Sequence, residues 1–113
     1  MKKLNIYIDD ESVLEYDSSQ SLDEQQLAFL DKMDRDMEKG IKLQGELIAN
    51  PDKQQRAKFV ALNLLRAISH DNQASISVSC AWLANRFSNL IEVHINQTDG
   101  TIEVELVEET LNS

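Results

Sequence analysis

The clearest pattern of apolar and polar positions lies between residues 50 and 70 and predicts an amphipathic helix. Asn50 and Pro51 are expected to begin it, because asparagine is a good N-cap and proline suits the first helical position. Phe59 and Leu62 lie off the main apolar stripe, which indicates a second contact for this helix. The stripe recurs every three or four residues and is expected to be buried; it consists of Ala57, Val60, Ala61, Leu64, Leu65 and Ile68.

A further helix is predicted before this one. Ser21 and Glu24 have the spacing of a capping box, in which each side chain bonds to the other residue's backbone amide. The apolar stripe that follows continues past Gly40, so the helix is expected to end near Leu43. The short linker 44–49 then predicts an antiparallel pair of helices.

Residues 74–82 fit two patterns. Serines alternate with apolar residues as in a strand, whereas the interval from Ile76 to Cys80 also fits one face of a helix. The helix is favoured, because its stripe continues to Phe87 while the alternation stops at Ala81.

Alternating apolar and polar residues predict β-strands near both ends of the chain. The ranges with this pattern are 3–8, 91–95 and 102–106, and residues 12–16 are compatible with a further short strand. Asp99 and Gly100 separate the last two strands and predict a tight hairpin, because a type I′ turn needs positive φ at both central residues. The tail from residue 108 to 113 is expected to be irregular.

The turn also predicts which residues of the hairpin lie opposite each other. The pairs are Thr98 with Thr101, Ile95 with Val104, and Val93 with Leu106. All the branched side chains then share one face, which would pack on the helices. The expected fold is therefore a single α+β domain, residues 1–113, with a small antiparallel sheet made of the N-terminal strand and the C-terminal hairpin, and three helices packed on one face.

The charge of the chain limits its partners. Eleven lysines and arginines against 20 acidic residues give a net charge of −9, which disfavours direct binding to nucleic acids or anionic membranes. The single Cys80 excludes an internal disulfide and is expected to be a buried structural thiol. No secretory or membrane-spanning segment is visible, so we expect a cytoplasmic protein.

The sequence carries no catalytic, cofactor-binding or metal-binding signature. Only three glycines are present, too few for a phosphate-binding loop, and there is neither a paired-cysteine spacing nor a serine elbow. We therefore assign no catalytic residue, no cofactor and no metal.

The leading hypothesis is a small noncatalytic regulatory module that binds a protein partner or forms a homodimer. Phe59 and Leu62 on the central helix, with Val78 and Trp82 on the next, are the apolar side chains left over after the core is assigned. They either contact the first helix or form an exposed patch for that partner.

Two other functions stay open at this point. His94 is expected opposite Glu105 in the hairpin, a pair that could serve a metal-assisted or acid-base enzyme. The acidic surface could instead act as a nucleic-acid mimic that binds a DNA-binding protein.

Overall fold

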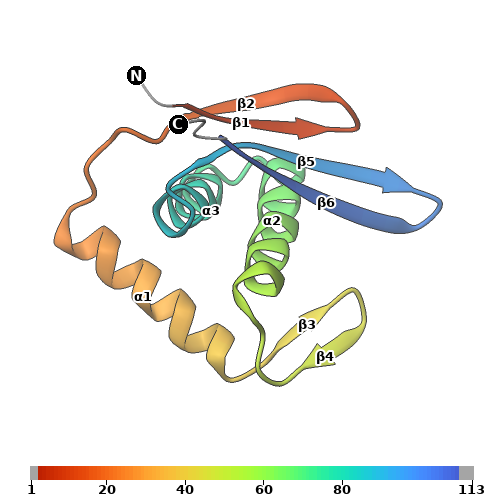
Figure 1. Ribbon diagram of the computed structural model, residues 1–113, viewed down its shortest axis with the longest axis horizontal. Coiled ribbons are helices and arrows are strands. Elements are labelled where there is room, and N and C mark those ends of the chain that lie inside the picture. The colour runs from red at the N-terminus through yellow and green to blue at the C-terminus, as the bar shows by residue number, and fades with distance from the viewer. Residues whose placement is uncertain (1–2, 110–113) are drawn as a thin grey trace. The chain divides into compact units, whose positions relative to one another are not determined.

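The structure, a computed structural model, describes residues 3–109 and has α+β architecture, as predicted (Figure 1). The described residues form three helices, a four-stranded sheet and a two-stranded sheet. In chain order the elements are β1 (Lys3–Ile8), β2 (Glu11–Asp17), α1 (Glu24–Glu38), β3 (Ile41–Leu43), β4 (Glu46–Ile48), α2 (Lys53–Ser69), α3 (Gln73–Arg86), β5 (Leu90–Thr98) and β6 (Thr101–Glu108). None of these helices is long and apolar enough to cross a membrane.

These elements form two compact units. The sheet unit, described over residues 3–20 and 80–109, contains β1, β2, β5, β6 and the end of α3. The helical unit, residues 21–79, contains α1, the β3–β4 hairpin, α2 and the start of α3. The division between the units falls inside α3.

The four-stranded sheet has the order β2-β1-β5-β6 and is mixed. The prediction of a purely antiparallel sheet is wrong, because β5 runs parallel to β1. Parallel strands need a long connection, and the three helices lie in the chain between these two strands. The chain at 12–16 does form a strand, β2, which pairs antiparallel with β1. Packing of the three helices on one face of this sheet stays a prediction.

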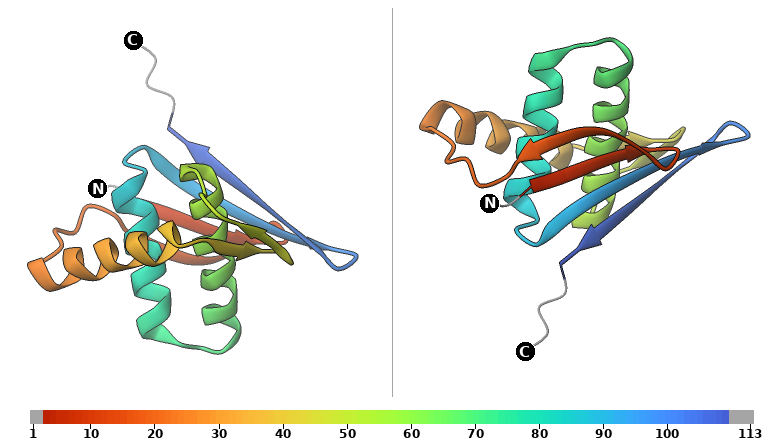
Figure 2. Two further views of the ribbon diagram at one scale, coloured as in Figure 1. Left: turned by 90° about the horizontal axis from the view of Figure 1, so that it is seen from below. Right: turned by 90° about the horizontal axis from the view of Figure 1, so that it is seen from above.

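The C-terminal hairpin has the predicted register. Thr98 pairs with Thr101, and the same alignment places Ile95 opposite Val104 and Val93 opposite Leu106. Asp99 and Gly100 have φ values of 48° and 79°, both positive as a type I′ turn requires. The hairpin extends as a long twisted ribbon (Figure 2). The tail is expected to be irregular from residue 108, but Glu108 is the last residue of β6, so the prediction is wrong there. The rest of the predicted tail, residues 110–113, lies outside the described residues.

Helix α1 is shorter than predicted at both ends. Its N-cap is Asp23, which accepts a hydrogen bond from the Gln26 amide at 2.8 Å, and not Ser21. An aspartate with glutamine three residues on is itself a capping box, and here it prevails over the serine. At the other end Gly40 takes a φ of 113°, a left-handed conformation that favours glycine, and the helix stops at Glu38.

A β-hairpin replaces the direct link expected between the first two helices. Ile41, expected at the end of α1, instead pairs with Ile48 across β3 and β4. The turn uses Gln44 and Gly45, both with positive φ. Strand β3 packs against α2. The direct linker predicted between the two helices is therefore wrong, whereas their antiparallel pairing stays a prediction.

Helix α2 confirms the central prediction, except at its start. The N-cap is Asp52, whose side chain accepts from the Gln55 amide at 2.8 Å, so Asn50 and Pro51 precede the helix. Most of the expected face is buried, whereas Leu65 and Ile68 are only half-buried. The buried residues of this helix are Ala57, Val60, Ala61, Leu64 and Ala67.

Helix α3 settles the ambiguity at 74–82 in favour of the helix. The expectation that Trp82 lies off the core face is wrong, because its side chain is only 1% exposed. Phe87 lies nearby, with its ring tilted against Trp82 at a centroid distance of 6.2 Å. A residue that is off one apolar stripe can still be buried when the helix is covered on more than one side.

Candidate binding pocket in the helical unit

A short connection brings the start of α3 beside the end of α2. His70 is the C-cap of α2, and Asp71 follows in a left-handed conformation with φ of 52°. Asn72 then caps α3, with its Oδ1 atom accepting from the Ser75 amide at 3.2 Å. The backbone N–H of Asn72 donates to the Ala67 carbonyl at 2.9 Å, which fixes the turn against α2.

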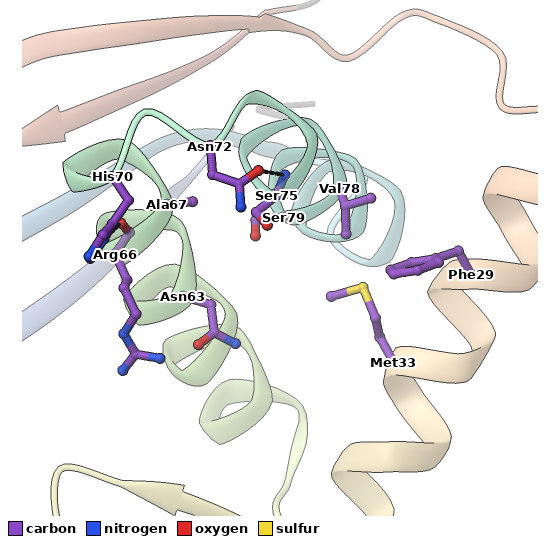
Figure 3. A pocket seen from close by; sticks show the side chains of 10 residues that line it. All are labelled: Phe29, Met33, Asn63, Arg66, Ala67, His70, Asn72, Ser75, Val78 and Ser79. Carbon is purple, nitrogen blue, oxygen red and sulfur yellow. Dashed lines mark hydrogen bonds between the residues drawn. The ribbon is translucent and has the colours of Figure 1, made fainter.

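A pocket of about 420 Å³ lies in the helical unit between α1, α2 and α3 (Figure 3). This volume is within the range of roughly 300–1,000 Å³ typical of small-ligand sites. The residues that line it are Phe29, Met33, Asn63, Arg66, Ala67, His70, Asn72, Ser75, Val78 and Ser79. They are arranged in three zones, apolar, polar and cationic.

The apolar zone is formed by Phe29 and Met33 of α1 and by Val78 of α3. Phe29 and Met33 are four residues apart, so they lie on one face of α1. The neighbouring Leu30 is buried, whereas Phe29 remains 47% exposed. The apolar side chains of α1 therefore extend beyond the part of the helix that the rest of the helical unit buries.

The polar zone lies in the middle of the pocket, where Ser79 of α3 and Asn63 of α2 contribute side chains. Ser79 is only 4% exposed, yet its hydroxyl makes no hydrogen bond with any residue from 3 to 109. Within the same range the Asn63 amide group also lacks a partner. Asn63 is half-buried, and the buried unpaired oxygen of the described residues is Ser18 Oγ and not Ser79 Oγ. Both pocket groups are therefore open to water or to an occupant of the pocket.

The cationic zone is at the end of α2, where Arg66 and His70 line the pocket opposite the apolar zone (Figure 3). The His70 Nδ1 atom is 2.8 Å from the Arg66 carbonyl oxygen. A carbonyl only accepts, so Nδ1 carries the hydrogen of this contact. The positive charge of the zone is that of the Arg66 guanidinium. Across residues 3–109 no carboxylate pairs with the Arg66 guanidinium, and no Asp or Glu lines the pocket.

The four partner-binding residues predicted from the sequence are not brought together here. Val78 lines the pocket, whereas Phe59 and Leu62 are half-buried on α2 and do not line it. The buried Trp82 belongs to the sheet unit and exposes no surface to a partner. The prediction missed Phe29, although its spacing to Met33 was a usable signal.

The predicted His94 site is present in the sheet unit with a different partner. Glu105 does lie opposite His94 in the hairpin register, but the His94 Nε2 atom is 2.8 Å from Glu92 Oε1 on the same strand. Tyr7, paired with His94 across the parallel strands, stacks on its ring with the centroids 4.5 Å apart. Over the described residues, no three His, Cys, Asp or Glu side chains gather in a way that could hold a metal ion.

Cys80 is completely buried in the sheet unit, which confirms the prediction for this thiol. Burial disfavours the charged thiolate and raises the pKa of Cys80 to about 12. A thiol with such a pKa is a poor nucleophile at neutral pH, because the thiolate is the reactive form.

No protein-family model, curated protein or solved structure matches this chain. The pocket must therefore be interpreted from its own chemistry.

Proposed function

We propose that this protein is a small noncatalytic module that binds a protein partner through the pocket of the helical unit. The observation that carries the proposal is the exposure of Phe29, which is 47% exposed at the mouth of that pocket. A partner that covered this ring would gain the free energy of burying an aromatic side chain in an existing concavity.

The distribution of exposed apolar side chains supports the same unit. Across the described residues the large hydrophobic side chains that remain exposed are Leu27, Phe29, Leu47 and Val13. All but Val13 belong to the helical unit. Of these side chains Phe29 lines the pocket, and an exposed aromatic ring at a concavity is typical of an interaction surface.

The chemistry of the pocket favours binding over catalysis. A serine nucleophile needs a base within hydrogen-bonding distance, and the Ser79 hydroxyl makes no hydrogen bond to His70. His70 is held by the Arg66 carbonyl through Nδ1. The pocket residues thus offer unpaired recognition groups without a nucleophile–base pair.

Site-specific photo-crosslinking in the cells that produce this protein tests the proposal. A benzophenone amino acid replaces Phe29 in one variant and Val13 in a control variant, since Val13 is similarly exposed at 42% but lies in the sheet unit. We expect a discrete protein adduct at position 29 and none at position 13. An adduct with twice the mass of the chain would identify the partner as a second copy.

Two outcomes would contradict the proposal. One is the recovery of only uncrosslinked chain from the Phe29 variant. The other is the same set of adducts from both positions, because that would reflect random collisions with exposed apolar groups.

A further inference from the structure

Resting on the proposed function, we infer that the pocket binds the carboxyl-terminal residue of a partner polypeptide. The large apolar side chain of that residue lies against Phe29, Met33 and Val78, and its carboxylate lies at Arg66. The shared chemistry is an apolar group that carries a carboxylate, and the observations favour a peptide as its source.

The carboxylate is inferred from the cationic zone. The chain has 20 acidic residues, yet no described one lines this pocket, whereas Arg66 and His70 both do. A guanidinium presents a planar fork of donors that matches the two oxygens of a carboxylate. The Arg66 fork has no partner within the described chain, so it can accept this ligand without breaking an ion pair.

The apolar side chain is inferred from the opposite zone. Figure 3 shows Phe29 and Met33 on α1 facing the α3 surface that carries Val78. The Phe29 ring and the flexible Met33 thioether can adapt to an aromatic or branched side chain. Since the apolar and cationic zones lie at opposite ends of the lining, one ligand that has both kinds of group can span them.

The peptide source is inferred from the polar zone between these ends. The carboxamide of Asn63 contains a donor and an acceptor, which is the pair that a peptide group requires. The Ser79 hydroxyl, from α3, lines the same pocket and adds a third polar position. A simple acid without a peptide group would leave these groups to water, whereas a terminal residue has its peptide group next to its carboxylate and can bond to them directly.

The test compares two dipeptides that differ in one group. Acetyl-Ala-Phe with a terminal carboxylate and acetyl-Ala-Phe with a terminal amide are titrated into the full chain, and backbone amide shifts are followed by NMR. We expect the acid to bind at least about tenfold more tightly, because a charge-assisted hydrogen bond is lost in the amide. The largest shifts are expected at Asn63, Arg66 and Ser79.

Two matched variants locate the carboxylate. Arg66→Met retains most of the aliphatic stem and is expected to weaken the acid by about tenfold while leaving the amide unchanged. Lys58→Met removes one positive charge from the same helix but outside the pocket lining, so its affinity for the acid is expected to remain within about twofold of the parent. The unchanged affinity for the amide shows that the Arg66 variant is folded.

Equal affinity for the acid and the amide, or no binding of either, would overturn the inference. So would 3-phenylpropionate if it bound as tightly as the dipeptide, since the occupant would then be a small acid. These results are separable from the crosslinking experiment. An adduct at position 29 together with equal dipeptide affinities would sustain the proposed function and reject only the carboxylate.

Discussion

The sheet unit and the helical unit differ in charge and in where their unpaired polar side chains lie. Residues 1–20 and 80–113 carry three basic and 11 acidic side chains, a net charge of −8, whereas residues 21–79 carry eight basic and nine acidic ones, a net charge of −1. Nearly all the excess negative charge of the chain is therefore in the sheet unit. Charge repulsion keeps such a surface from associating with other acidic surfaces, while the nearly neutral unit lacks that protection.

Both units contain paired and unpaired polar side chains. In the sheet unit His94 is paired with Glu92, and the Asp9 carboxylate accepts from the Gln97 amide at 2.8 Å. In the helical unit the side chains of Asn63, Arg66 and Ser79 lack partners among the described residues. Among the described residues the buried side-chain oxygen without a partner is Ser18 Oγ, which belongs to the sheet unit. The unpaired groups of the helical unit differ from it because they line a pocket that a ligand can enter.

The largest effect is expected from the core of the sheet unit. Ile95 is completely buried, and Ile95→Ala should lower the free energy of unfolding by about 2–5 kcal/mol, because it removes apolar contacts and leaves a cavity. Urea unfolding followed by the fluorescence of the single Trp82 measures the loss. Val13→Ala on the exposed side of the same unit is the control and should change stability by less than about 0.5 kcal/mol. A loss below about 1 kcal/mol for Ile95→Ala would mean that the sheet is not the tightly packed part.

An intermediate effect on the free energy of unfolding is expected when the pH is raised, because Cys80 of the sheet unit titrates. Burial raises the pKa of Cys80 from the ordinary 9.0 to about 12, so the folded chain keeps a proton that the unfolded chain releases above pH 9. The free energy of unfolding is therefore unaffected by this thiol below pH 9, and it falls as the pH rises from 9 toward 12, because only the unfolded chain gains by releasing the proton. Urea midpoints measured between pH 8 and pH 11 should fall more steeply for the parent than for Cys80→Ala.

Tyr16 titrates in both of these proteins, and its pKa is raised chiefly by burial and next by the charge of Cys80. Cys80→Ala removes that second cause, so the difference between the two curves contains the Cys80 thiol together with its effect on Tyr16. Parallel pH curves for the parent and for Cys80→Ala would contradict a buried neutral thiol.

The smallest effect is expected in the helical unit and has the opposite sign. Ser79→Ala loses no hydrogen bond within residues 3–109 and introduces a better helix former at a position that is only 4% exposed, so stability should rise by up to about 1 kcal/mol. Ser77→Ala, at an exposed position of the same helix, reports the gain from helix propensity alone. Thermal unfolding of both variants gives the difference. A destabilised Ser79→Ala protein would show that this hydroxyl serves the fold and is not reserved for a ligand.

Local patterns were sufficient where the structural determinant lies within a few residues. The hairpin register followed from Asp99 and Gly100, since a two-residue turn aligns every pair beyond it. The period of the apolar residues located α2 and decided the conformation of residues 74–82. The misplaced N-caps were also local, because both true caps, Asp23 and Asp52, have a glutamine three residues later.

Long-range contacts decided the rest. The parallel pairing of β1 with β5, which stacks Tyr7 on His94, joins segments nearly a chain length apart, and no local spacing encodes its direction. The burial of Trp82 likewise depends on neighbours that a single helical stripe does not reveal.

The pocket required the folded chain for the same reason. Its apolar zone comes mainly from α1 and its cationic zone from the end of α2, and the turn at Asn72 places Ser79 between them. The sequence contains the basic Arg66 and the apolar Met33, but a concavity that holds both exists only after three helices meet. The proximity of their side chains, and therefore the chemistry of the site, is a property of the tertiary structure.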